Sequence, residues 1–141
     1  QVLRLFNGYG PRQSLDYFIP AKIEQAIKGH IELHGGFITK DFVYVEDVVD
    51  ALVRALESQY VGPLNIGTGI QSSLKEVAYI ISKYFNASLT EVSVNDDKGP
   101  TRMQCDYSRA ERILGWSPEV SLEDGLNRTC EYYESEAKKL G

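Results

Sequence analysis

The sequence lacks clustered positive charge, long apolar runs and closely spaced cysteines. Its 20 Asp and Glu residues outnumber 15 Lys and Arg residues and leave a net charge of −5, which argues against a general electrostatic grip on nucleic acid. No apolar run approaches the roughly 20 residues that cross a bilayer, so we expect no membrane contact. Cys105 and Cys130 lie far apart, and we expect two reduced thiols in a cytoplasmic protein.

Residues that build a metal centre or a catalytic nucleophile are also scarce. The two histidines, His30 and His34, have no cysteine or carboxylate pair at metal-ligand spacing around them. No G-x-S-x-G or other nucleophile motif occurs. We therefore expect neither a metal ligand nor a catalytic residue in this chain.

Apolar residues recur with strand and helix periodicity by turns. We expect short strands over residues 2–6, 31–34, 42–45, 64–66 and 89–94, with a break after residue 6. Helical spacing predicts helices over residues 16–28, 46–58, 73–84, 106–115 and 121–139. In the second of these, one apolar face would hold Val45, Val48, Val49, Leu52, Ala55 and Leu56. The alternation predicts an α/β fold, in which few short strands with flanking helices leave an incomplete sheet.

The turn Gly67-Thr68-Gly69 lies between an expected strand and an expected helix, where a dinucleotide-binding fingerprint would occur. The position of the third glycine is Ser72, and the next acidic candidate, Glu91, begins a strand and does not end one. We expect an ordinary strand-to-helix turn, with or without ligand contact, and no cofactor site.

Three polar residues at the edges of expected elements are candidates for ligand binding. Asn7 ends a strand just before a glycine-rich break, which is a usual place for a ligand contact. Lys40 lies at the rim of a buried strand, and Arg102 follows the polar loop 95–101. Cations at such edges suit the recognition of a diphosphate. For each of the three, the alternative is a solvated surface residue.

Four motifs in order resemble the NAD-dependent nucleotide-sugar epimerase/dehydratase family of extended short-chain dehydrogenases/reductases. Residues 4–13 (RLFNGYGPRQ) resemble its R-x-F-N-V-Y-G-P-R-Q, and residues 39–48 (TKDFVYVEDV) resemble its R-D-F-I-Y-V-E-D-V. Residues 65–69 match N-I-G-T-G, and residues 106–118 resemble D-x-S-K-A followed by L-G-W-x-P. The motifs extend over most of the chain, so the resemblance is specific.

The resemblance implies that the chain is the C-terminal, substrate-binding part of such an enzyme. In this family the N-terminal part binds NAD and supplies a Tyr-x-x-x-Lys pair. Tyr79 and Lys83 fit that bare spacing, but they follow the N-I-G-T-G motif, and we interpret them as a helix face. Epimerases, 4,6-dehydratases and decarboxylases share these motifs, so the resemblance leaves the reaction open.

The resemblance also implies roles in a nucleoside-diphosphate sugar pocket. Asn7 matches the residue that holds the phosphate or sugar, and His34 matches a position beside the nucleobase. Lys40 replaces the usual arginine that grips the diphosphate, which keeps the charge but loses the two-pronged geometry. Arg102 would supply a second phosphate contact, although Asp97-Lys98-Gly99-Pro100 replaces the usual R-x-G-D pattern. Gln71 would lie at the edge of the base.

We therefore expect one substrate-binding domain over residues 1–141, without the N-terminal NAD-binding domain. The apolar run directly after Gln1 is typical of a strand already under way, so we expect the sequence to be part of a longer polypeptide. Exposure of the face that packs on the NAD-binding half would favour a homo-oligomer. The alternatives are a stand-alone, non-catalytic module, which binds a nucleotide sugar or pairs with a separate cofactor-binding chain, and a decayed fragment that binds nothing.

Overall fold

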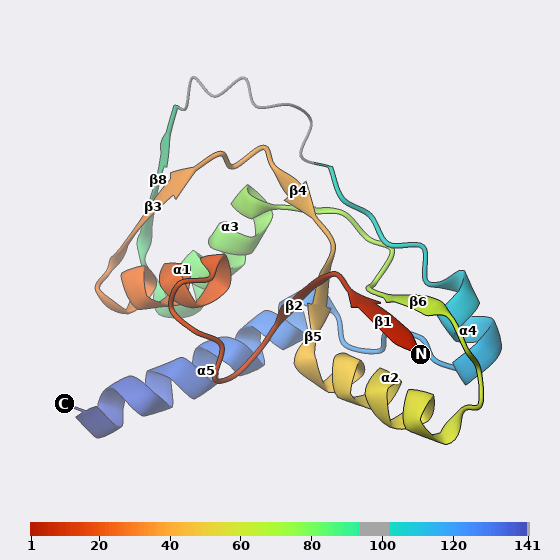
Figure 1. Ribbon diagram of the computed structural model, residues 1–141. Coiled ribbons are helices and arrows are strands. Elements are labelled where there is room, and N and C mark those ends of the chain that lie inside the picture. Colours follow the sequence, from red (N-terminus) through yellow and green to blue (C-terminus); the bar gives the residue numbers. More distant parts are fainter. Residues whose placement is uncertain (94–101, 141) are drawn as a thin grey trace.

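The structure, a computed structural model, describes residues 1–93 and 102–140. The strands are β1 (Val2–Leu5), β2 (Asn7–Tyr9), β3 (His30–His34), β4 (Thr39–Lys40), β5 (Phe42–Tyr44), β6 (Pro63–Ile66), β7 (Ser72–Ser73) and β8 (Ser88–Val92). The helices are α1 (Phe18–Ile27), α2 (Val45–Glu57), α3 (Leu74–Phe85), α4 (Ser108–Leu114) and α5 (Leu122–Leu140). The expected α/β class is confirmed, and the chain folds into two lobes (Figure 1).

The strands form small partial sheets and not one continuous sheet. Within the described residues, β1 pairs in parallel with β6, β2 with β5 and β3 with β8, while β4 pairs antiparallel with β7. The sequence did not indicate β2, because Asn7 to Pro11 was expected to break the strand. Instead the chain changes partner at Phe6, whose N–H still donates to Ile66 O, and continues as β2 beside β5.

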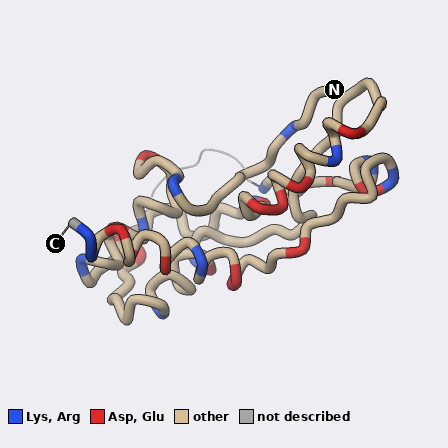
Figure 2. The backbone as a smooth tube through the Cα atoms, turned by 90° about the horizontal axis from the view of Figure 1, so that it is seen from below, with Lys and Arg blue, Asp and Glu red and all other residues tan. Residues whose placement is uncertain are grey.

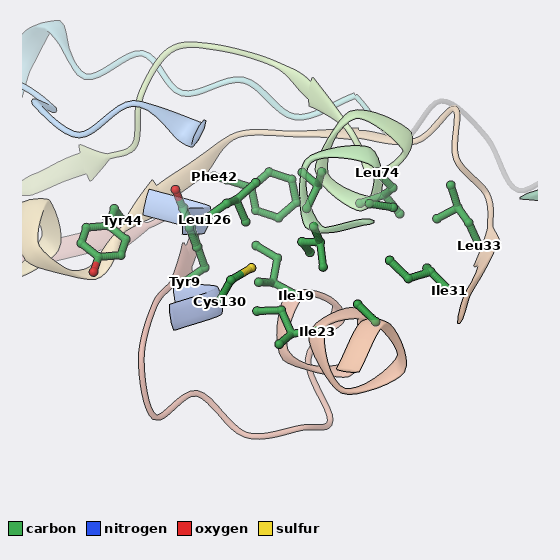
Figure 3. Packing of buried hydrophobic residues seen from close by; sticks show 14 residues of the cluster. Tyr9, Ile19, Ile23, Ile31, Leu33, Phe42, Tyr44, Leu74, Leu126 and Cys130 are labelled. Atoms are coloured by element: carbon green, nitrogen blue, oxygen red, sulfur yellow. The ribbon is translucent and has the colours of Figure 1, made fainter. Parts of the chain in front are cut away.

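The helical lobe, as we name it, consists of α1, α3, α5, β3 and β8. Strand β3 alternates between exposed and buried residues, and Ile31 and Leu33 point into the core with no exposed surface. They meet Ile23 of α1 and Ile81 of α3 in a cluster that also contains Cys130 of α5 (Figure 3). Apolar stripes from three helices therefore close one core on the inner face of the β3–β8 pair.

The open lobe, as we name it, consists of β1, β6, α2 and α4. Its core surrounds Leu64 and Ile66 of β6, with Ala51 of α2, Ala110 of α4 and the fully buried Trp116. Within the described residues β1 has a single neighbour, β6, so its other edge carries unpaired backbone groups. This lobe is the less complete of the two.

Strand β5 joins the two cores because its side chains alternate between them. Phe42 and Tyr44 belong to the core of the helical lobe, whereas Val43 belongs to that of the open lobe. All three residues are buried. A strand with both faces covered reads as a continuous apolar run, which is the pattern that predicted it.

Helix α2 departs from the single apolar face that its sequence predicted. Val48 and Ala55 are buried, but Val49, Leu52 and Leu56 are 52%, 44% and 86% exposed. The helix thus carries apolar residues on two sides and buries one of them here. A helix that is apolar on more than one side is normally covered on each.

Charged residues are spread over the molecule. Figure 2 shows basic and acidic positions interspersed along the backbone, with neither sign confined to one part. Across residues 1–93 and 102–140, the helices are too short or too polar to span a membrane.

Candidate functional site

A cavity of about 700 Å³ lies between the two lobes. The segment from Leu5 to Ser14 forms most of its wall, and Lys40, Phe42, Val45 and Val48 contribute from β4, β5 and α2. A volume of this size falls in the range of small-molecule sites. The motif that follows β1 therefore surrounds a cavity.

Close packing explains the glycines and aromatics of this wall. A Cβ on Gly10 would lie 2.5 Å from Val45 Cγ1, so only glycine lets the segment approach α2. The Tyr9 ring packs edge-on against Phe42 and Tyr44, with centroids 6.2 and 5.6 Å apart. Its hydroxyl donates to Leu122 O, and burial raises the Tyr9 pKa well above its usual range. Tyr9 is thus an anchor of the wall and stays protonated.

Asn7 and Lys40 line this cavity together. The Asn7 amide group donates from Nδ2 to Asp41 O at 3.0 Å, and its backbone N–H donates to the same carbonyl at 3.1 Å. These two bonds fix the side chain at the junction of β2 and β5. Lys40 precedes Asp41 directly, so one short stretch of β4 and β5 places both residues.

Gln71 and Arg102 form a second group, which meets at Thr39. Thr39 Oγ1 donates to Gln71 Oε1 at 3.2 Å, and Thr39 pairs with Arg102 in an isolated parallel bridge. Gln71 also donates to Gln104 Oε1 at 3.3 Å. Thr39 adjoins Lys40 in β4, so the two groups are neighbours along one strand. The expected loop 95–101, with the departure from R-x-G-D, lies outside the described residues.

His34 belongs to neither group. It ends β3, is exposed, and is hydrogen-bonded through Nε2 to the Glu32 carboxylate on the solvent face of that strand. It does not line the cavity. Within the described part of the chain, no group of three or more His, Cys, Asp or Glu side chains could hold a metal ion. Of the five expected residues, Asn7 and Lys40 therefore line the cavity. Gln71 and Arg102 meet beside them at Thr39 but, like His34, are not among the residues that line it.

Asp41 directly follows Lys40 and is hydrogen-bonded to segments that carry residues of both groups, Asn7 on one side and Gln71 and Arg102 on the other. The sequence did not indicate it as a site residue. Its side chain has no exposed surface. Oδ1 accepts from Thr68 N and Thr68 Oγ1, both at 2.7 Å, and Oδ2 accepts from Gly69 N at 2.8 Å and Cys105 N at 2.9 Å. A buried carboxylate needs such donors. An acidic residue directly before a fully apolar strand was the signal that could have found it.

This carboxylate also decides the chemistry of the Gly67-Thr68-Gly69 turn. In a dinucleotide site the N–H groups of such a turn would point at a pyrophosphate. Here the N–H groups of Thr68 and Gly69 are bonded to Asp41, and a negative charge occupies the place of the phosphate. A Cβ on Gly67 would lie 2.6 Å from Cys105 Cβ, so protein fills the approach. The turn does not fit a dinucleotide.

The Tyr79-x-x-x-Lys83 spacing lies within α3, as expected. Tyr79 is 54% exposed, and Lys83 Nζ lies 5.6 Å from the centre of its ring. Neither residue lines the cavity described above. The interpretation of this pair as a helix face is confirmed.

Comparison with known proteins gives the same assignment as the motifs. The family model described as GDP-mannose 4,6 dehydratase matches residues 1–129. UDP-glucuronic acid decarboxylase 3 of Arabidopsis thaliana is 35% identical in an alignment of 131 positions that covers 89% of this chain and 38% of that protein. UDP-glucuronic acid decarboxylase 1 of Xenopus tropicalis is 35% identical in an alignment of 144 positions that covers 96% of this chain and 34% of that protein.

Solved structures agree with this. UDP-glucose 4-epimerase from Thermotoga maritima, solved with UDP-glucose, has a TM-score of 0.83 at 32% identity, over 96% of this chain and 46% of that one. UDP-glucuronic acid 4-epimerase from Bacillus cereus, solved with UDP-glucuronic acid and NAD, has a TM-score of 0.83 at 31% identity, over 95% and 45%. The fold and the wall of the cavity define part of a short-chain dehydrogenase/reductase. The chain belongs to the NAD-dependent nucleotide-sugar epimerase/dehydratase family and spans less than half the length of these relatives.

Proposed function

We propose that this chain is the nucleotide-sugar-binding part of an NAD-dependent epimerase, dehydratase or decarboxylase. The observation that carries the proposal is the convergence of Asn7 and Lys40 on one cavity, beside Gln71 and Arg102, in a chain of this family. Lys40 follows Thr39 in β4, and Arg102 is paired with Thr39 in the isolated bridge. The two cations would bind a diphosphate by charge-assisted hydrogen bonds. Asn7 would orient the sugar or phosphate next to them.

A UDP-sugar is the best-supported ligand. The relatives described above act on UDP-glucuronic acid or UDP-glucose according to their names. The side-chain amide of Gln71 would form hydrogen bonds with the edge of the base. His34 is hydrogen-bonded to Glu32 outside the cavity and has the weakest support of the five residues. We therefore assign the phosphate and sugar contacts to Asn7, Lys40 and Arg102.

The chemistry belongs to a second, NAD-binding half that would complete the open lobe. Three observations support this arrangement: the unpaired edge of β1, the exposed apolar side of α2 and the greater length of the relatives. The Gly67-Thr68-Gly69 turn does not fit NAD, so the cofactor would bind that other half. In the same proposal residues 1–141 form one domain, and the exposed side of α2 would drive self-association wherever that half is missing.

Titration of the full-length protein with UDP-glucuronic acid, followed by calorimetry, tests the proposal. We expect saturable binding that Lys40→Ala weakens about tenfold, as for loss of a hydrogen bond to a charged group. Lys40→Arg should bind at least as tightly, because the guanidinium restores two-pronged contact. Lys28→Ala is the control, since that exposed lysine forms its ion pair with Glu24 of α1, away from the cavity.

The two alternatives make different predictions in the same experiment. A non-catalytic module would bind a nucleotide sugar without converting it, even in the presence of NAD. A decayed fragment would give no heat with UDP-, dTDP-, GDP- or CDP-sugars, and this result would refute the proposal. Turnover by residues 1–141 alone would contradict the assignment of the chemistry to another half.

A further inference from the structure

Asp41 connects the three segments that carry the proposed ligand contacts. Its backbone carbonyl accepts from the Asn7 amide. Its carboxylate accepts from Gly69 N, two residues before Gln71, and from Cys105 N, three residues after Arg102. The bonds to Thr68 and Cys105 span 27 and 64 positions of sequence. The pairings β2–β5 and β4–β7 already place Asn7 and Ser72 beside this residue, and its buried carboxylate adds the links to the glycine turn and to Cys105.

We propose that Asp41 is a positioning residue that fixes Asn7, Gln71 and Arg102 relative to Lys40, a role that rests on the proposed function. It is fully buried and so cannot touch the ligand from the cavity. Its proposed contribution is to keep the segments that carry the ligand-binding side chains rigid. Binding is tighter when the binding groups are held in place before the ligand arrives.

The hydrogen-bond geometry shows why only a carboxylate suffices. Each of its oxygens accepts two hydrogen bonds, so the site presents donors on both sides. An asparagine could accept on one side only, and its NH₂ group would face N–H or O–H donors on the other. Whichever way the amide turned, either Thr68 or the pair Gly69 and Cys105 would lose its acceptor.

Asp47 offers a matched control in the same chain. It is also buried, at 6% exposed, and its carboxylate accepts from Glu119 N and Val120 N, both at 3.1 Å. Its carbonyl accepts from Trp116 Nε1 at 2.9 Å. Asp47 therefore joins remote segments as Asp41 does, but these segments carry none of the proposed ligand contacts.

Amide-resolved hydrogen exchange and titration with UDP-glucuronic acid, on the full-length protein, test the proposal. In Asp41→Asn we expect exchange at Thr68, Gly69 and Cys105 to rise about tenfold or more, because those N–H groups lose a charged acceptor. In Asp47→Asn, hydrogen exchange should instead become faster at the amides of Glu119 and Val120. The two variants are compared at temperatures where they have lost the same amount of stability. There, Asp41→Asn should raise the Kd for UDP-glucuronic acid about tenfold, and Asp47→Asn should raise it by less than about threefold.

Thr68→Val serves where Asp41→Asn does not fold, because it removes one hydrogen bond to Oδ1 and keeps the shape of the side chain. The proposal is overturned if exchange at these amides is unchanged, or if the two aspartate variants bind equally well at matched stability. A wild-type protein that binds no nucleotide sugar would refute the proposed function instead. The exchange pattern would then decide by itself whether Asp41 holds the turn.

Discussion

The two lobes differ in how fully they bury their apolar surface. In the helical lobe, α1, α3 and α5 close over the inner face of β3 and β8, and polar residues such as His30 and Glu32 cover the outer face. In the open lobe, β1 leaves one edge unpaired and α2 leaves Val49, Leu52 and Leu56 exposed. One lobe covers its apolar surface, whereas the other leaves a strand edge and apolar side chains of α2 uncovered among the described residues.

The proposed ligand site lies where the two lobes meet. The cavity wall runs from Leu5 at the end of β1 through β2 to Ile19 of α1. Strand β5 ties the lobes together by sending Phe42 into one core and Val43 into the other. The affinity for a ligand between the lobes would therefore depend on how stably the open lobe is packed against the helical lobe.

The largest expected effect is the loss of Trp116 from the open lobe. This fully buried indole packs edge-on against Tyr107, with centroids 5.9 Å apart, and donates to Asp47 O. We expect Trp116→Ala to lower the free energy of unfolding by about 3–5 kcal/mol, measured by urea denaturation with circular dichroism. In residues 1–141 by themselves, Leu56→Ala, at an 86% exposed position, should change it by less than about 0.5 kcal/mol.

The same denaturation curves test whether the lobes are one unit. Because β5 is shared, we expect a single transition in both variants. Two separate transitions, or a loss below about 1 kcal/mol for Trp116→Ala, would mean that the open lobe contributes little to the stability of the whole.

An intermediate effect is expected on the exposed side of α2. Leu52→Glu should leave the free energy of unfolding of residues 1–141 within about 0.5 kcal/mol and reduce their self-association in sedimentation experiments. In the full-length protein the same substitution should destabilise by about 1–3 kcal/mol, because a charge would be buried. Tyr79→Glu, on the exposed side of α3, is the control and should be neutral in both. Equal effects in the two proteins would contradict a covered α2.

The smallest expected effect on stability near neutral pH is the one that comes from ionisation of the two buried thiols. Burial raises the pKa of Cys105 to about 12, with added repulsion from Asp41 and Asp106, and burial raises that of Cys130 to about 12 as well. The folded state therefore favours the neutral thiols. This stability is fully present below the ordinary cysteine pKa of about 8.5 and is lost as the pH rises from there towards 12.

Iodoacetamide labelling at pH 8 checks this directly. Both thiols should react about a hundredfold more slowly in the native protein than in urea, because the thiolate is the reactive form. Cys105 should react faster than Cys130, which lies in the helical lobe. Rapid native labelling of Cys130 would show that the helical lobe opens more readily than its packing indicates.

Local sequence patterns predicted most elements of both lobes. The helix expected over residues 73–84 begins as α3 directly after Ser73, whose Oγ accepts from Glu76 N at 3.0 Å and caps the helix. The expected strands at 31–34 and 64–66 are β3 and β6, extended by one residue at the start. The short strands β4 and β7 were missed, because two-residue strands carry no periodicity and exist only through their pairing.

The sequence by itself determined the alternation of strands and helices, the family motifs and the approximate place of Asn7 and Lys40. These properties depend on neighbours within a few residues, which periodicity and motif spacing record. Only the tertiary structure decided that the glycine turn is filled by the Asp41 carboxylate, that His34 stands apart and that one apolar side of α2 stays exposed. Each of these depends on partners tens of residues away, and a carboxylate gives no sign in the sequence of which N–H groups it will meet.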